Sequence, residues 1–159
     1  MADNANADAN LLSRLDAMDF ATVAPEEFAR LVKGLSKKEI AEVMTGELRV
    51  KVLRAVFSRM ERQFRPEAAG SLRALIRWQV TGDTEAVYEV SIADGGCAVR
   101  EGRTEADART TLSMGDAEFL RLVSGNANPV TMFMTRKLKV AGDVGLASGL
   151  TRLFDIPKA

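Results

Sequence analysis

The sequence predicts an α+β fold, in which a helical first part is followed by a meander of strands. Apolar residues recur at helical spacing through residues 25–64, and the period then changes to two over residues 72–80. Asp94-Gly95-Gly96 is a strong hairpin signal between two further stretches of alternating residues. Because helices and strands are grouped in the chain and do not alternate, the pattern favours α+β over a parallel α/β fold.

The first part of the chain carries clear helix signals after a polar start. Residues 1–10, rich in Asn, Ala and Asp, predict a disordered start, and residues 11–18 have the spacing of a short helix. Ser36 and Glu39 match the capping box that opens a helix. We therefore expect three further helices, over residues 25–34, 36–46 and 47–64.

The remainder of the chain mixes strands and helices. Strands are expected over residues 72–80, 87–92, 97–99, 110–114 and 138–140, where apolar and polar residues alternate. Helices are expected over residues 116–123, 129–135 and 144–154. Asp116 and Asp143 stand at positions that favour an N-cap, and Asn128-Pro129 opens the helix between them.

Composition excludes several kinds of chemistry. The chain has 159 residues, which suits one domain, and it contains no histidine and a single cysteine, Cys97. Imidazole-based catalysis, an internal disulfide and a thiolate zinc cluster are therefore excluded. The sequence has no apolar run near the ~20 residues that cross a bilayer and no signal-peptide pattern at its start. We expect a cytoplasmic protein without a catalytic site, metal or cofactor.

The zero net charge conceals a segregation of charge along the chain. Residues 30–77 carry twelve Lys and Arg against five acids, and residues 83–118 carry nine acids against three Arg. The helix over 47–64 supplies five of these bases: Arg49, Lys51, Arg54, Arg59 and Arg62. They predict either a solvated helix face or a contact with anionic lipid. Nucleic acid is not expected as a partner, because no aromatic residues are interleaved with the cations.

The last third of the chain contains an ordered set of motifs. A T-x-x-M strand ends at Met114, Phe119 begins F-L-x-L-x-x-G, Asn128 begins N-P-x-x-x-F, Lys137 begins K-L-K-V-x-G, and Gly145 begins G-L-A. In this order the motifs resemble the sterol carrier protein 2 family of lipid-binding domains. The resemblance is detailed over residues 107–157 and looser over residues 57–106.

The resemblance implies a five-stranded, mostly antiparallel sheet, covered on one face by helices that enclose an apolar cavity. Such a cavity accepts a sterol, fatty acid, acyl-CoA or phospholipid without covalent chemistry. The family-like domain spans residues 47–159, and residues 1–46 form an N-terminal helical extension. The expected lining residues are Ile76, Trp78, Leu112, Met114, Phe119, Leu122, Met132, Phe133, Leu146, Leu150 and Phe154.

One position departs from the family pattern. Family members usually have glycine immediately before the K-L-K strand, where a turn can require a positive φ. This chain has Arg136 there. Either the turn differs from that of the family, or Arg136 adopts the same geometry at some cost in energy.

A second interpretation belongs to a different class of function. The chain can instead be an interaction module of the same fold with a filled cavity, which binds a protein partner or a second copy of itself through residues 1–65. The N-terminal extension and the segregated charge favour this alternative. The extension can also be a lid over the cavity, and the sequence does not rank the lid above the interface.

Overall fold

The elements of the computed structural model follow the predicted order, with one additional short helix over residues 66–69. The structure describes residues 25–82 and 84–154. Its helices are α2 (Pro25–Lys33), α3 (Lys37–Val43), α4 (Gly46–Gln63), α5 (Pro66–Ala69), α6 (Asp116–Val123), α7 (Pro129–Met134), α8 (Val144–Ser148) and α9 (Leu150–Leu153). Its strands are β1 (Ala74–Thr81), β2 (Ala86–Ala93), β3 (Gly96–Glu101), β4 (Thr110–Gly115) and β5 (Lys139–Gly142). The expected disordered start and the helix over 11–18 lie outside the described residues.

The five strands form one sheet in the order β3-β2-β1-β4-β5. All neighbouring strands are antiparallel except β1 and β4, which run parallel with Trp78 opposite Leu112. Asp94 and Gly95 both have positive φ, as a tight hairpin turn between β2 and β3 requires. The predicted α+β class and the mostly antiparallel five-stranded sheet are therefore confirmed.

Local signals place several helix ends. The N–H of Glu39 donates to Ser36 Oγ at 3.1 Å, and the N–H of Ser36 donates to Glu39 Oε1 at 3.0 Å. The predicted capping box is thus confirmed. The single helix predicted over residues 144–154 is instead the pair α8 and α9, because Gly149 ends one and begins the other, and glycine is a poor helix former.

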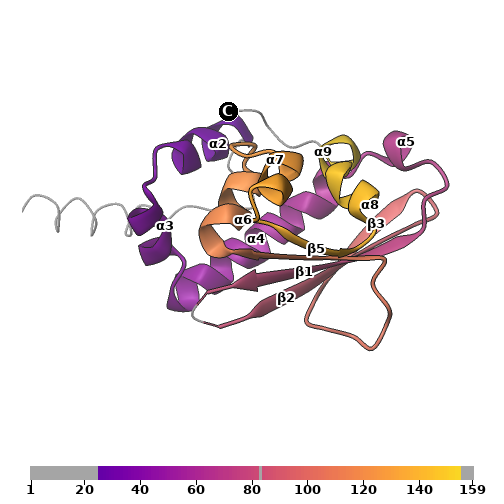
Figure 1. Cartoon of the computed structure of the whole chain (residues 1–159), viewed down its shortest axis with the longest axis horizontal. Coiled ribbons are helices and arrows are strands. Elements are labelled where there is room, and N and C mark those ends of the chain that lie inside the picture. The colour runs from indigo at the N-terminus through magenta and orange to yellow at the C-terminus, as the bar shows by residue number, and fades with distance from the viewer. Residues whose placement is uncertain (1–24, 83, 155–159) are drawn as a thin grey trace, which may run out of the picture.

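The helices gather on one face of the sheet, and the long loop between β3 and β4 hangs from the other face (Figure 1). Phe57 of α4 forms the centre of the contact between the two layers. Its ring stacks on Tyr88 with centroids 4.1 Å apart and lies 5.3 Å from the ring of Phe119 and 5.8 Å from that of Trp78. Four aromatic rings therefore join α4 and α6 to β1 and β2.

Helices α2 and α3 share this core. Phe28, Val32 and Ile40 are buried in the same apolar cluster as the sheet residues. Asn126, in the turn between α6 and α7, donates from Nδ2 to the carbonyl oxygen of Ala29 at 2.9 Å. In the part of the chain that the structure describes, residues 25–46 thus have no core separate from that of the family-like domain.

The far face of the sheet holds a buried ion pair. Arg77 Nε donates to Glu89 Oε2 at 2.8 Å, and both side chains are almost fully buried. Thr104, in the loop after β3, donates to the same carboxylate from its hydroxyl and its N–H. Burial raises the pKa of Glu89, but the hydrogen bonds from Thr104 and Arg77 outweigh it and hold that pKa below its ordinary value. The pair therefore fastens the loop to the sheet.

We predict that Glu89→Gln costs about 3 kcal/mol of the unfolding free energy at neutral pH, because Arg77 keeps its hydrogen bonds to the carbonyl oxygens of Thr104 and Ala106 but is left buried without a counter-charge. Because the pKa of Glu89 is lower in the folded protein, its carboxylate stabilises the fold at pH values above the ordinary pKa of 4.5. This stabilisation is lost as the pH falls through the lower pKa of the folded state. Urea unfolding between about pH 3 and pH 7 measures both effects. The exposed Glu85→Gln is the control, and an equal pH slope in wild type and Glu89→Gln contradicts the assignment.

Arg136 adopts the positive φ that was expected if the turn before β5 suits glycine. Its φ is +63°, in the left-handed region that costs a side-chain-bearing residue energy. Of the two alternatives left open by the sequence, the structure therefore supports the second.

We predict that Arg136→Gly raises the unfolding free energy by up to about 1 kcal/mol, because relief of the left-handed backbone exceeds the added entropy of the unfolded chain. Chemical denaturation measures this gain. A loss of stability contradicts the strained turn.

Candidate functional site

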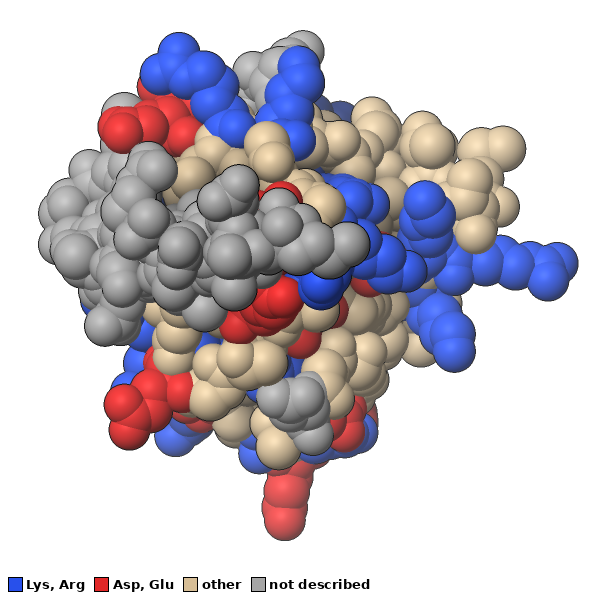
Figure 2. Space-filling model, turned by 90° about the vertical axis from the view of Figure 1, so that its left-hand side faces the viewer, with Lys and Arg blue, Asp and Glu red and all other residues tan. Residues whose placement is uncertain are grey.

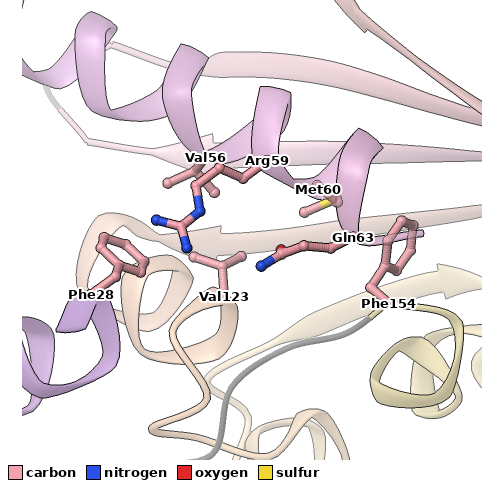
Figure 3. Close-up of a pocket in the computed structure, with 7 residues that line it drawn as sticks. All are labelled: Phe28, Val56, Arg59, Met60, Gln63, Val123 and Phe154. Carbon is pink, nitrogen blue, oxygen red and sulfur yellow. The ribbon is translucent and has the colours of Figure 1, made fainter. Parts of the chain in front are cut away.

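A groove opens between α2, α4 and α6, beside the residue that follows α9 (Figure 3). We call it the α2 groove. Its lining residues are Phe28, Val56, Arg59, Met60, Gln63, Val123 and Phe154. The free space among them is about 370 Å³ when the part open to solvent is included, but only about 20 Å³ admits the centre of a water-sized molecule. The groove is therefore nearly filled by its own side chains.

The walls of the α2 groove are apolar, with two polar side chains contributed by α4. The guanidinium of Arg59 points between Phe28 and Val123, and the amide of Gln63 points toward Val123 (Figure 3). Arg59 Cζ lies 5.2 Å from the centre of the Phe28 ring, a cation–π distance. Burial, with the charge of Arg62 nearby, lowers the pKa of Arg59, although an arginine stays protonated in proteins. A cation is thus held beside an apolar channel.

The structure distributes the eleven predicted lining residues among several places. Phe154 lines the α2 groove. Phe133 lines a second hollow, and Leu146 lines a third. The other eight are buried in the apolar core and line none of these three hollows: Ile76, Trp78, Leu112, Met114, Phe119, Leu122, Met132 and Leu150.

Trp78 is the unusual member of this buried set. It is 2% exposed, and its Nε1–H has no hydrogen-bond partner. A buried donor without an acceptor costs free energy, which an oxygen atom brought in by a ligand would recover. The centre of the interior therefore contains one unused polar group between the sheet and the helices.

The second and third hollows lie near the C-terminal end. The second has a wholly apolar surface and lies between α7, β5 and α8; the space that admits the centre of a water-sized molecule is about 60 Å³. The third lies between α5, α8 and α9, offers about 290 Å³ by the same measure, and is more open and more polar, with Asp143 and Arg152 on its rim. Both are thus roomier than the α2 groove. Neither is enclosed between the sheet and α4.

Six lining residues of the α2 groove were missing from the sequence prediction: Phe28, Val56, Arg59, Met60, Gln63 and Val123. Val56 and Met60 belong to the apolar stripe over residues 47–64, and Val123 follows the F-L-x-L motif, so a signal existed for them. Phe28 lies on the apolar face of the helix expected over residues 25–34, which predicted its burial, but the family resemblance does not cover that segment and so gave no sign that it lines a groove.

The expected basic face of the helix over 47–64 needs a correction. Arg49 is 4% exposed, and its Nε donates to Asp116 Oδ1 at 3.1 Å. Arg59 is 7% exposed, in the α2 groove, and Arg54 pairs with Glu101 at 3.1 Å. Arg49 and Arg59 face the interior because their long stems cover apolar neighbours and their charges find partners there. They cannot belong to an exposed basic surface.

The described residues give little support to metal binding, to cysteine-based catalysis or to a membrane-spanning helix. Among residues 25–82 and 84–154, no three His, Cys, Asp or Glu side chains are arranged to hold a metal ion. Burial and the nearby Glu61 raise the pKa of the Cys97 thiol to about 11, so it is a poor nucleophile at neutral pH. In the same described ranges, no helix combines the length and apolar character that crossing a membrane requires.

Comparison with known proteins gives consistent matches. Hydroxysteroid dehydrogenase-like protein 2 of Xenopus laevis is 27% identical over 102 residues, which are 64% of this chain and 24% of the relative. Sterol carrier protein 2 of Homo sapiens is 37% identical over 73 residues, which are 45% of this chain and 13% of the relative. The chain thus spans a quarter or less of these relatives.

The fold comparison gives the same result. The apo form of Sterol Carrier Protein 2 from Yarrowia lipolytica superposes with a TM-score of 0.53 at 23% identity, covering 70% of this chain and 94% of that one. A sequence model of the SCP-2 sterol transfer family matches residues 56–155, from the middle of α4 to beyond α9. Since this match covers more than half of the chain, the protein belongs to the SCP-2 sterol transfer family.

Proposed function

We propose that the chain binds a sterol or another lipid in the α2 groove and carries it without covalent chemistry. The observation that carries the proposal is the groove itself, an apolar channel with a buried cation on its wall, in a member of a sterol transfer family. The cargo class suggested by the name of the human relative agrees with this chemistry. The alternative, an interaction module acting through residues 1–65, is not favoured, because α2 and α3 turn their apolar side chains into the protein's own core.

The groove has to widen before it can hold a lipid. Sites for small molecules usually measure about 300–1,000 Å³, far more than the space that is open here. The element on the outside of the groove is α2, which is held by the burial of Phe28 and Val32, by the contact of Phe28 with Arg59, and by the hydrogen bond from Asn126. We propose that α2 is the cover that moves when a ligand enters.

The side chains around the groove define the ligand class. A hydrocarbon chain or ring system that buries roughly 300 Å² of apolar surface gains about 7.5 kcal/mol from leaving water, before the entropic cost of association. A hydroxyl, carboxylate or phosphate on that ligand would lie beside Arg59 or Gln63. The unpartnered Nε1–H of Trp78 supports a second polar contact if the apolar part reaches deeper into the interior. We therefore propose a lipid with a polar group at one end.

The first test fills the α2 groove. Val56→Phe adds bulk to the wall, and we predict about tenfold weaker binding of the fluorescent fatty acid cis-parinaric acid and of the fluorescent sterol dehydroergosterol. Val50→Phe is the matched control, since Val50 lies on the same helix and is 40% exposed. Circular dichroism and thermal unfolding check that both variants fold. Equal affinities for both variants contradict the assignment of the groove.

The second test loosens the cover. Phe28→Ala removes the ring that closes the groove and contacts Arg59, and we predict that a bound fatty acid dissociates about fivefold faster. Leu35→Ala shortens an apolar side chain of the same N-terminal segment away from the groove and serves as the control. The single tryptophan, Trp78, lies in the interior and gives an intrinsic fluorescence signal for stopped-flow measurement. An unchanged dissociation rate in Phe28→Ala removes α2 from the mechanism.

A further inference from the structure

An exposed apolar patch surrounds α7. Val130, Phe133 and Val144 are 44%, 40% and 44% exposed, and all three line the second hollow, so they lie together. Met134, at the end of α7, is 77% exposed. These four residues, which we call the α7 patch, are four of the five large apolar side chains exposed in the described part of the chain. Their concentration in one place indicates a surface that meets an apolar partner.

The chain around the α7 patch carries an excess of positive charge. The one acid next to a patch residue, Asp143 beside Val144, is paired with Arg109 at 3.1 Å. Residues 119–142 contain no acid and four bases: Arg121, Arg136, Lys137 and Lys139. Arg136 and Lys137 form the turn after α7, where their N–H groups donate to the carbonyl oxygens of Phe133 and Met132. Both side chains are exposed. Cations therefore stand directly beside the exposed apolar side chains.

The figures show the same arrangement on a larger scale. In Figure 1, α7 and β5 lie toward the reader, and in Figure 2 this side of the molecule is at the right. There, several Lys and Arg side chains project beside tan residues, and red Asp or Glu atoms are visible only toward the lower edge of that side. Elsewhere in that view the two signs of charge are mixed.

We infer that the α7 patch and the turn that follows it form a docking site for the surface of an anionic lipid bilayer. Apolar side chains enter the boundary between headgroups and acyl chains, and flanking Lys and Arg contact the anionic headgroups. The excess of positive charge favours this occupant over a second copy of the chain, which would bring like charges together around a twofold axis. Arg136 supports the inference, because the chain accepts a left-handed backbone there to place a cation.

The inference rests on the proposed function in one respect only: a lipid carrier has to meet a membrane to load or deliver its cargo. It moves the membrane contact away from the helix over 47–64, where two of the five predicted bases are buried. It adds a physical link, since Asn126 in the turn before α7 holds the backbone of α2. The docking site thus adjoins the proposed cover of the α2 groove.

The experiment measures the partition of the full chain onto vesicles by flotation. Vesicles of phosphatidylcholine with about 30% phosphatidylglycerol are compared with pure phosphatidylcholine vesicles, at about 0.1 M and 0.5 M salt. We expect binding to the anionic vesicles that weakens with salt. Equal binding to both kinds of vesicle, or none, overturns the inference.

Two pairs of variants locate the surface. Arg136→Gly with Lys137→Gln should lower partition onto anionic vesicles at least about tenfold, against less than about twofold for Lys37→Gln with Lys38→Gln, which removes the same number of exposed charges elsewhere. Val130→Ser with Met134→Ser should lower it by a similar factor, with the exposed Val50→Ser as control. If variant and control lose vesicle partition equally, the attraction to the anionic membrane is spread over the protein surface, and the assignment of the docking site to the α7 patch is wrong.

Ligand binding without vesicles separates this inference from the proposed function. The α7 variants should keep wild-type affinity for cis-parinaric acid, because none of their positions lines the α2 groove. If the α7 variants lose vesicle binding while Val56→Phe binds cis-parinaric acid as tightly as wild type, the docking site is supported and the assignment of the α2 groove is wrong. Sedimentation that shows a dimer, dissociated by Val130→Ser with Met134→Ser, would make the patch an interface between copies and overturn the inference.

Discussion

The packing of Phe57 against the sheet is the contact on which the rest of the structure depends. Its ring lies on Tyr88 and beside Trp78 and Phe119, so this single residue of α4 joins both structural layers. With that face fixed against the sheet, the adjacent face of α4 carries Val56 and Met60 toward α2 and α6. The α2 groove exists because α4 is buried on two sides.

The two sides of α4 have different mechanical characters. The sheet side is a close-packed aromatic cluster, in which any change of volume costs free energy. The α2 side is closed by a nine-residue helix that buries Phe28, Ala29 and Val32. The described polar attachments of this helix are the cation–π contact of Phe28 and one side-chain hydrogen bond to its backbone. Local opening draws on the least stabilised elements of a fold, so α2 is a more natural moving part than the sheet or α4.

Sequence reasoning succeeded where the signal is local. The capping box at Ser36 depends on residues three apart, and the turn at Asp94 depends on two adjacent residues, so both are readable in one short window. The parallel pairing of β1 with β4 cannot be predicted from a short window, because it joins residues more than 30 positions apart through a crossover. The family resemblance supplied the five-stranded, mostly antiparallel sheet, and the order of the strands within it came from the structure.

The site was less accessible to sequence reasoning than the fold. A charged residue on an amphipathic helix is normally assigned to solvent, yet Arg49 and Arg59 turn inward because Asp116 and Phe28 are brought to them from other elements. Phe28 reaches the groove from a segment outside the family match. Leu112 and Phe119 were expected on a cavity wall, and in the structure both are buried and line none of the three hollows described above. Apolar periodicity identifies buried positions, but it does not distinguish a packed core from a cavity.

The measurement that tests the central claim most directly is photoaffinity mapping of the bound lipid. A fatty acid and a sterol that each carry a diazirine on the apolar part would be bound to the full chain, activated by light, and located by mass spectrometry of the digested protein. Binding in the α2 groove predicts labels on Phe28, Val56, Met60 and Val123, which are displaced by excess unlabelled lipid. Displaceable labels confined to the walls of the second or third hollow, or no displaceable label at all, would contradict it.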